Sequence, residues 1–162
     1  GLFNRRFAGE FFRNLEKSGK DGWCVGMMDI DDFKLVNDLY GHSAGDAVLI
    51  LIADTMRETL RKTDVLIRWG GEEFLLLLAD VHPETAVTIL DKLRETISST
   101  KIIADGKAIS VTVTIGVARL ACRDIHASIG ISDEMLYEGK KRGKNMVFSM
   151  SCGARAEQET NP

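Results

Sequence analysis

The sequence predicts an α/β (α+β) domain in which a mixed central sheet is flanked by helices, in the manner of a ferredoxin-like sandwich with additions. Two observations support this class. Amphipathic helical stretches alternate unevenly with short apolar runs along the 162 residues. Two of these runs, residues 65–67 and 74–78, flank Gly70 and Gly71 and predict a central β-hairpin with a two-residue primed turn, where glycine adopts positive φ without strain. A hairpin inside an alternating pattern makes the sheet mixed rather than entirely parallel.

Five helices are expected from apolar residues that recur at i, i+3, i+4 and i+7, which is one face of a helix. In the first helix, Phe7 and Phe11 belong to one such stripe and Asn4 is the expected N-cap. Pro83 opens the fourth helix, and Gly143 is the expected C-cap of the last. The expected helices cover residues 1–15, 33–40, 49–60, 83–97 and 129–141.

Five strands are expected from short apolar or β-branched runs that turn residues enclose. Asp105 and Gly106 mark a turn before one of them, in which valine, threonine and isoleucine alternate. The polar tail at residues 151–162 is expected to be disordered, so that one domain covers residues 1–150. The expected strands cover residues 23–28, 65–67, 72–78, 109–118 and 146–148.

Composition narrows the function classes. The net charge of −3 provides no broad basic field, so a polymeric nucleic acid is not an expected partner. The sequence contains no apolar run of about 20 residues and no signal peptide, and we expect a cytoplasmic domain, although a longer parent protein could be attached to a membrane. The 3 cysteines lack metal-ligand spacing and favour a reducing compartment.

Acidic residues follow two of the expected strands. Asp29 ends the strand at residues 23–28, and Glu72 and Glu73 follow the two glycines of the hairpin. If the two regions are neighbours, Asp29 faces Glu72, and such carboxylates repel each other unless a cation lies between them. An all-oxygen set suits Mg²⁺ or Mn²⁺. Because consecutive strand residues point to opposite faces, Glu72 is the expected ligand, and Glu73 remains a second-metal or acid–base candidate. A polar hairpin tip in solvent is the alternative.

Other residues could bind a nucleotide. Lys34, Arg68 and the basic stretch at residues 140–144 are candidates for phosphate contacts, although positive charge at a helix C-terminus also suits the helix dipole. Asn37 and Asp46 could bind a purine edge, while Asp46 could instead cap the second helix of this region. These residues together indicate a nucleoside triphosphate site with Mg²⁺.

Four separated motifs carry a family resemblance. GLFNRR, DIDDFKLVNDLYGHSAGD, RWGGEEF and LYEGKKRGKN together resemble the GGDEF domain of diguanylate cyclases, in its GGEEF version, over residues 1–148. The resemblance implies a palm-like nucleotide cyclase fold and the condensation of two GTP molecules into cyclic di-GMP, with release of two pyrophosphates, in a homodimer of facing half-sites. The chain lacks the segment that usually precedes GLFNRR, so we expect that an N-terminal sensory or dimerising region is missing.

The resemblance also implies roles for the catalytic and metal-binding residues. Asp29, the carbonyl of Ile30 and Glu72 would hold Mg²⁺ or Mn²⁺. Glu73 would support a second metal or deprotonate the attacking 3′-hydroxyl. Lys34 is grouped with the catalytic residues because it would contact the phosphates.

The substrate site follows from the same resemblance. Asn37 and Asp46 would recognise guanine, and the two glycines would let the α-phosphate and the ribose approach the backbone. The expected GTP-binding residues are Phe33, Asn37, Asp46, Gly70, Gly71, Lys140 and Lys144.

An arginine–aspartate pair, Arg61 and Asp64, precedes the hairpin at the position of the family's inhibitory product site. Arginine suits bidentate contact with a phosphate or a guanine edge, whereas an ordinary solvated pair at i, i+3 is the alternative. Two other functions stay open: a catalytically silent receptor for GTP or cyclic di-GMP, and a related cyclase that uses ATP. The complete set of acidic residues argues against the first, and Asp46 argues against the second.

Overall fold

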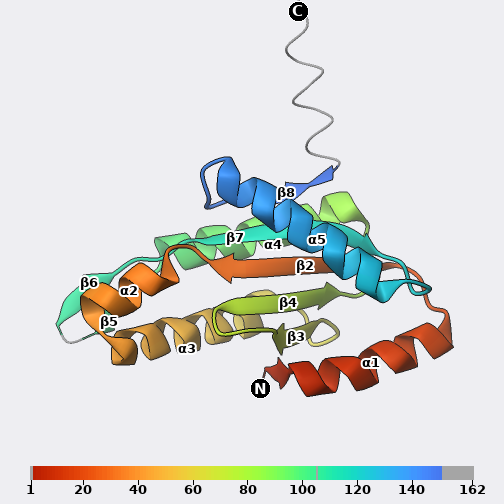
Figure 1. The fold of residues 1–162 in the computed structure, drawn as a ribbon, viewed down its shortest axis with the longest axis horizontal. Coiled ribbons are helices and arrows are strands. Elements are labelled where there is room, and N and C mark those ends of the chain that lie inside the picture. The colour runs from red at the N-terminus through yellow and green to blue at the C-terminus, as the bar shows by residue number, and fades with distance from the viewer. Residues whose placement is uncertain (1, 105, 151–162) are drawn as a thin grey trace, which may run out of the picture.

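The computed structural model describes residues 2–104 and 106–150, and the expectation of a disordered tail concerns residues outside these ranges. A six-stranded sheet runs in the order β1-β3-β4-β2-β7-β8 through the molecule (Figure 1). Its neighbours are antiparallel except at the two ends, where β1 with β3 and β7 with β8 are parallel, so the predicted mixed sheet is confirmed. The strands are β1 (Phe3–Asn4), β2 (Trp23–Ile30), β3 (Val65–Arg68), β4 (Glu73–Leu78), β7 (Val113–Leu120) and β8 (Val147–Ser149).

Helices cover both faces of this sheet (Figure 1). The helices are α1 (Arg5–Ser18), α2 (Phe33–Tyr40), α3 (His42–Thr59), α4 (Pro83–Ser99) and α5 (Ile125–Lys141). One core joins α2, α3 and α4 to one face, and a second core joins α1 and α5 to the other. The succession β2-α3-β3-β4-α4-β7 is the β-α-β-β-α-β pattern of ferredoxin-like folds, which confirms the predicted fold class. No helix in the described ranges is both long enough and apolar enough to cross a membrane.

The uninterrupted apolar run of β4 is explained by burial on both faces of the sheet. Phe74, Leu76 and Leu78 belong to the core on the α3 and α4 side, whereas Leu75 and Leu77 belong to the core on the α1 and α5 side. All five side chains are at most 1% exposed. Since successive strand residues alternate between faces, a strand enclosed by two helical layers needs apolar residues at every position.

The N-terminal helix begins where the sequence predicts. The side chain of Asn4 accepts a hydrogen bond of 3.0 Å from the backbone N–H of Phe7, and Gly19 ends the helix in a left-handed conformation at φ 59°. Asn4 also pairs with Arg68 as part of β1, a strand that was not predicted because two residues are too few to show a period. This pairing ties the chain start to the strand that leads into the glycine turn.

Several expected element boundaries are wrong. The helix expected at residues 49–60 begins at His42, and the one expected at residues 1–15 spans Arg5–Ser18. The strand expected at residues 109–118 is divided: β6 (Lys107–Ile109) pairs with β5 (Ile102–Ala104) in a separate two-stranded sheet, and β7 begins only at Val113. An uninterrupted β-branched pattern does not show where a chain leaves one sheet for another. The last helix begins at Ile125, earlier than expected, because Asp124 caps it through a 3.0 Å hydrogen bond from the N–H of Ala127.

The helix α5 lies directly on β7 at a glycine. A Cβ on Gly116 would lie 2.0 Å from the carbonyl oxygen of Ser132 and 2.1 Å from the backbone nitrogen of Leu136. This close contact places the last turn of α5 over the end of β2. The helix then ends as predicted near Gly143, whose φ of 125° allows the N–H of Lys144 to bond the carbonyl of Gly139 at 3.2 Å.

Candidate active site

The glycine turn between β3 and β4 is longer than predicted. The strand β3 ends at Arg68 and β4 begins at Glu73, and neither Gly70 nor Gly71 is among the described residues with positive φ, so the expected two-residue primed turn is wrong. The N–H groups of Trp69 and Gly70 donate to the carbonyl of Glu73 at 2.9 and 3.2 Å. The guanidinium of Arg68 donates to the carbonyl of Gly71 at 2.7 Å. Backbone and arginine bonds therefore hold the turn.

The two glycines leave the turn without side chains. A Cβ on Gly71 would meet no atom within 4 Å, so the backbone here faces open space. A Cβ on Gly70 would lie 2.4 Å from a carboxylate oxygen of Glu73, which shows that the Glu73 side chain folds back over the turn. Glycine at position 70 lets the Glu73 carboxylate lie close to the backbone, and at position 71 it leaves open space beside the turn.

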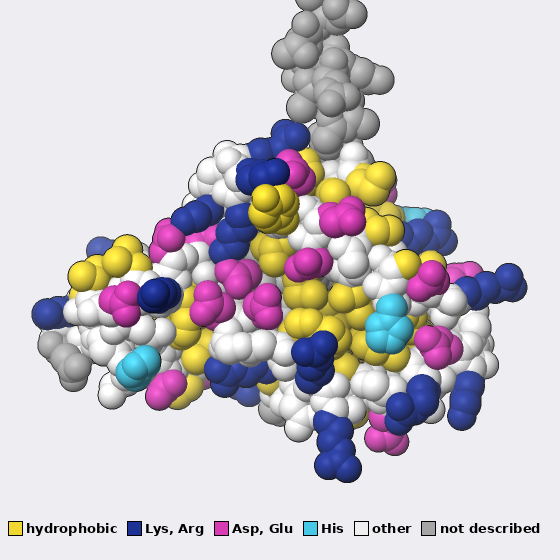
Figure 2. Space-filling view, viewed as in Figure 1, with side chains coloured by type: hydrophobic (Ala, Val, Ile, Leu, Met, Phe, Trp, Pro, Cys, Tyr) yellow, Lys and Arg dark blue, Asp and Glu magenta, His cyan; other side chains and the backbone are white. Residues whose placement is uncertain are grey.

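The acidic residues meet in a register one residue away from the expected one. The strand β2 pairs Asp29 with Glu73, and the N–H of Ile30 donates to the carbonyl of Glu72 at 3.3 Å. The expectation that Asp29 faces Glu72 is therefore wrong, because the longer turn moves the start of β4. The carboxyl of Glu72 is still influenced by Asp29: burial raises the pKa of Glu72, and the negative charge of Asp29 raises it further. Figure 2 shows acidic side chains grouped over the end of β2 and the hairpin turn.

Lys140 brings a positive charge from α5 into this acidic group. Its ammonium donates to Asp29 and lies 2.8 Å from a carboxylate oxygen of Asp31. Burial alone would lower the pKa of Lys140, but its bonds to Asp29 and Asp31 raise it, so the amine stays charged. Burial raises the pKa of Asp29, and Lys140 opposes that shift. The lysine predicted to contact phosphate thus rests on two carboxylates in the protein without nucleotide.

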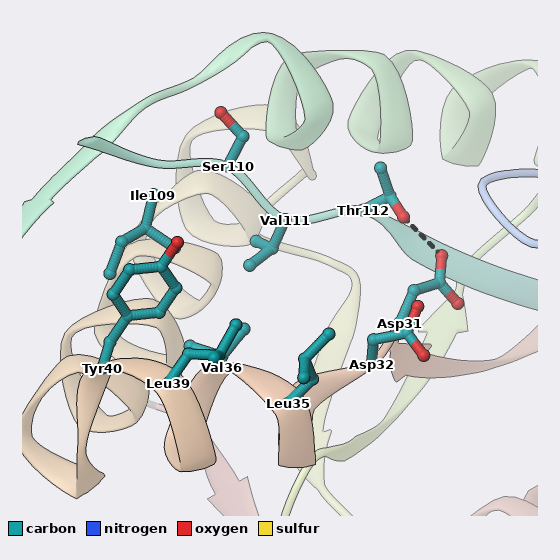
Figure 3. Close-up of a pocket in the computed structure, with 10 residues that line it drawn as sticks. All are labelled: Asp31, Asp32, Leu35, Val36, Leu39, Tyr40, Ile109, Ser110, Val111 and Thr112. Carbon is teal, nitrogen blue, oxygen red and sulfur yellow. Dashed lines mark hydrogen bonds between the residues drawn. The ribbon is translucent and has the colours of Figure 1, made fainter. Parts of the chain in front are cut away.

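Asp31 is the most elaborately bonded carboxylate of the site, and it was not among the predicted site residues. One oxygen of Asp31 accepts a 2.7 Å hydrogen bond from the hydroxyl of Thr112 (Figure 3). The hydroxyl of Thr114 at 2.7 Å and the N–H of Asn145 at 3.0 Å also donate to this carboxylate. Burial alone would raise the pKa of Asp31, but the bonds from Lys140, the threonines and Asn145 lower it. These partners lie at least 81 residues away in the chain, so no local pattern could indicate them.

Lys144 reaches the same loop from the turn after α5. Its ammonium lies 2.6 Å from a carboxylate oxygen of Asp32, and both residues have positive φ, 63° and 54°. Lys141 instead pairs with Glu138 on the exposed side of the helix. The basic stretch at the end of α5 is therefore divided between the acidic loop and solvent.

The predicted base-binding residues lie where α2 packs on α3. A Cβ on Gly45 would lie 2.0 Å from the amide oxygen of Asn37 and 3.3 Å from the ring of Phe33, so glycine allows both side chains to lie against α3. Asp46 follows on the exposed side, inside a helix that begins at His42; the alternative that it caps this helix is therefore wrong. Nothing in the sequence pattern singled out Gly45, because its partner Asn37 belongs to another helix.

A hollow of about 150 Å³ lies between α3 and the hairpin strands. It is lined by Leu2, Leu49, Ile50, Ala53, Arg68 and Phe74. Asp46 and Leu49 are three residues apart on α3, so both lie on one side of the helix. The recess is largely apolar, and Asp46 lies one turn of α3 before it. Lys34 is exposed on the first turn of α2.

The oxygen atoms of the acidic group suit a magnesium ion. No set of three Asp, Glu, His or Cys side chains among residues 2–104 and 106–150 is arranged to hold a metal without help. Mg²⁺ commonly uses only one or two protein carboxylates and completes its shell with water and phosphate oxygens. Asp29 and Glu72 are two such carboxylates, and each has a raised pKa that a neighbouring cation would relieve. The chemistry of these two carboxylates fits Mg²⁺.

The Arg61 and Asp64 pair forms a local turn rather than an ion pair. One carboxylate oxygen of Asp64 accepts from the N–H of Arg61 at 2.9 Å, and the other accepts from the N–H of Ala79 at 3.2 Å. The solvated i, i+3 side-chain pair is not formed, since the ion pairs of the described residues do not include these two side chains. Arg61 is exposed beside a hollow of about 280 Å³ that Arg57 and Lys62 also line.

Comparisons with known proteins agree with this architecture. The family model "Diguanylate cyclase, GGDEF domain" matches residues 1–146. The chain is 36% identical over 143 residues to Diguanylate cyclase A of Treponema denticola, and the match covers 85% of this chain and 38% of that protein. The chain therefore spans well under half the length of that relative.

Two solved structures share the fold. The coiled coil and GGDEF domain of DgcB from Caulobacter crescentus, in complex with c-di-GMP, superposes with a TM-score of 0.84 at 25% identity, covering 91% of this chain and 81% of that one. The active GGEEF domain of a diguanylate cyclase from Vibrio cholerae superposes with a TM-score of 0.81 at 29% identity, covering 92% and 97%.

Proposed function

This chain belongs to the GGDEF family of diguanylate cyclases, and from that premise we propose that it condenses two GTP molecules into cyclic di-GMP and releases two pyrophosphates. One observation carries the proposal. The acidic group of Asp29 and Glu72, with Lys140 beside it, lies at the bare glycine turn, and a recess is lined by Arg68 and Phe74 of the hairpin and by Leu49 of α3. Asp46 lies one turn before Leu49 on α3. Charged groups that suit the phosphates of a nucleotide thus lie near an apolar recess that suits its base.

Magnesium fits the phosphate end of this site. Held by Asp29, Glu72 and the carbonyl of Ile30, it would neutralise phosphate charge and align the attacking and leaving oxygens. Asp29 would then no longer need Lys140 as its counter-charge, and the ammonium of Lys140, still held by Asp31, would be available to a phosphate oxygen. Lys144 and Lys34, both at the edge of the acidic loop, provide further positive charge for the triphosphate.

The base end of the site favours guanine. The carboxylate of Asp46 can accept from the N1–H and the N2–H of guanine together, whereas adenine offers an acceptor at N1. Asn37 provides an amide, and its orientation is fixed by Gly45. The apolar recess at Leu49 offers a surface for the face of the ring. We therefore assign GTP rather than ATP as the substrate.

The attacking hydroxyl comes from a second GTP, so catalysis needs two half-sites. Glu73 is the cross-strand neighbour of Asp29, and its carboxylate lies over Gly70. That position makes Glu73 the candidate to accept the proton of the 3′-hydroxyl, with support of a second metal as the other role. Because each domain binds one GTP, the active species is a homodimer in which two copies face each other.

Product inhibition is assigned to the surface around Arg61. Three basic side chains, Arg57, Arg61 and Lys62, surround one hollow there, which suits the two phosphates of cyclic di-GMP. Asp64 is already bonded to two backbone N–H groups, so its role is to shape the turn that presents Arg61.

The direct test is to incubate the protein with GTP and Mg²⁺ and to separate the nucleotides by chromatography. We expect cyclic di-GMP from GTP, none from ATP and none when a chelator removes the metal. The specific rate should rise with protein concentration as dimers form. If no product forms at high protein concentration while GTP still binds, the cyclase proposal is wrong and the chain is a nucleotide receptor.

A further inference from the structure

We propose that Asp31 is a positioning residue, which holds the ammonium of Lys140 at the place where it meets the substrate phosphates. This inference rests on the proposed function, because it names the residue that fixes a phosphate-binding group of the same site. Asp31 itself is only 5% exposed, and one of its carboxylate oxygens lies 2.8 Å from the ammonium of Lys140, so we assign its effect on the nucleotide to that lysine.

The carboxylate of Asp31 is fixed in orientation by donors on both oxygens. One oxygen accepts from the hydroxyl of Thr114 and lies 2.8 Å from the ammonium of Lys140. The other accepts from the hydroxyl of Thr112 and the N–H of Asn145. A buried carboxylate with this many donors cannot rotate without leaving a polar group unpaired, which is costly. Lys140 is thus bonded to a rigid acceptor.

Asn145 fixes this arrangement from the opposite side. It has φ of 48°, and its N–H donates to Asp31 and lies 3.1 Å from the hydroxyl of Thr114. Its side-chain oxygen accepts from Arg94 of α4 at 2.9 Å. Arg94 is only 14% exposed and is itself held by Asp91 at 2.6 Å. Thr114 of β7 and Asn145 of the turn after α5 therefore contact Asp31 directly, and Arg94 of α4 holds Asn145 in place.

The two carboxylates that hold Lys140 differ in their freedom. Asp29 is 17% exposed at its side chain and borders Glu72, whereas the side chain of Asp31 is 3% exposed and already bonded to protein donors. If Asp29 turns to a metal, Lys140 loses that partner and keeps Asp31. A lysine is a point charge on a flexible four-carbon chain, so without a second acceptor its ammonium would not stay at one place. Asp31 provides that acceptor.

The competing explanation is that Asp31 only fastens the end of β2 to β7 and the turn after α5. Both explanations predict that loss of Asp31 lowers stability. They differ in GTP binding, because a positioning residue acts through Lys140 alone. Its effect on GTP affinity must then disappear when Lys140 is absent, whereas a purely structural effect must persist.

A double-variant cycle tests this. Asp31→Asn, Lys140→Met and the double variant are compared by the dissociation constant for GTP with Mg²⁺, by KM and kcat, and by Tm without nucleotide. We expect Asp31→Asn and Lys140→Met each to raise the dissociation constant by about tenfold, and the double variant to resemble Lys140→Met. Asp54→Asn is the matched control, since it also removes an aspartate ion pair, with Arg57, on an exposed part of α3.

Without nucleotide, Asp31→Asn should lower Tm by roughly 10 °C, because it breaks a buried bonded charge. Thr112→Val is the milder variant in case this one does not fold. It removes one donor to Asp31, and it should raise the GTP dissociation constant by about threefold in the wild type and not at all beside Lys140→Met.

The outcomes separate the inference from the proposed function. An equal loss of GTP affinity with and without Lys140 overturns the positioning role. If the wild-type protein binds no GTP, the proposed function is wrong, and the Tm values still decide the contact between the two residues: additive losses in the double variant overturn it, and a loss smaller than the sum supports it.

Discussion

The acidic end of β2 and the turn at Arg61 are two charged sites that are built in opposite ways. At the first, Lys140 reaches Asp29 across 111 residues of chain, and packing of α5 on the sheet brings them together. At the second, Asp64 bonds the N–H of Arg61 three residues away, and its other partner, Ala79, is 15 residues away. One site depends on tertiary packing, and the other depends on a local turn.

This difference has a consequence for the charges. At the long-range site, each lysine is already paired with an aspartate, so a ligand must replace existing bonds. At the local site, the backbone bonds the carboxylate of Asp64, and the guanidinium of Arg61 stays exposed. Contact of a ligand with Arg61 breaks no ion pair of the described residues, although Arg57 beside it is paired with Asp54. We therefore expect substitutions at the acidic end of β2 to change activity. At the turn around Arg61, we expect substitutions to change product inhibition and stability separately.

The largest effect is expected for Asp29→Asn. Loss of a carboxylate that holds the metal should lower kcat by about a hundred- to a thousandfold, while Lys140 keeps its bond to Asp31 and the fold is retained. Rates of cyclic di-GMP formation and the circular dichroism spectrum check this. A rate within tenfold of wild type would remove Asp29 from the catalytic group.

The second largest effect is expected on stability, when the packing of α5 against β7 is disturbed. Gly116→Ala places a Cβ against the backbone of α5 and should lower the free energy of unfolding by about 3 kcal/mol. Gly130→Ala, on the same helix, meets open space and should raise it by roughly 0.5–1 kcal/mol. Urea unfolding measures both. Equal effects of the two substitutions would mean that α5 does not rest on β7 as closely as described.

A smaller effect is expected for Arg61→Ala, and it concerns regulation alone. It should raise the inhibition constant for cyclic di-GMP by about tenfold or more, because a charged hydrogen-bond donor is lost, and leave the unfolding free energy within about 0.5 kcal/mol. Initial rates at increasing product concentration measure this, with the exposed Arg13→Ala of α1 as the control. An unchanged inhibition constant would mean that the turn at Arg61 does not bind cyclic di-GMP.

The smallest effect is expected for Asp64→Ala, which tests the other half of the local pair. Two backbone N–H groups lose their acceptor, so the free energy of unfolding should fall by about 1–2 kcal/mol. Inhibition should weaken less than in Arg61→Ala, since Asp64 shapes the turn without contacting the product in our proposal. Stability equal to wild type together with complete loss of inhibition would reverse these two roles.

Much of the fold could be predicted because the spacing of apolar residues shows which face of a helix or strand is buried. The stripe from Phe7 to Leu15, the helix at residues 33–40 and the apolar run of β4 each follow from which face is covered. The short strand β1 and the division between β6 and β7 could not be predicted, because pairing partners decide them. The predicted turn type is wrong for a related reason: two glycines suggest positive φ, but neither has it here, and one of them instead lies against the side chain of Glu73.

The site was predictable as a set of residues and not as a set of contacts. Asp29, Glu72 and Lys140 were all recognised as candidates, yet the sequence could not show that Lys140 rests on Asp29. The register error between Asp29 and Glu72 followed from the unknown length of the turn. Asp31 could not be identified as a site residue, because the groups that donate hydrogen bonds to it lie far away in the sequence.

The most direct test of the proposed cyclase activity is ³¹P NMR of the protein mixed with GTP and Mg²⁺. We expect the triphosphate signals to be replaced by those of pyrophosphate and of a phosphodiester, with two pyrophosphates for every cyclic di-GMP. Absence of the phosphodiester signal, or release of inorganic phosphate in place of pyrophosphate, would contradict it.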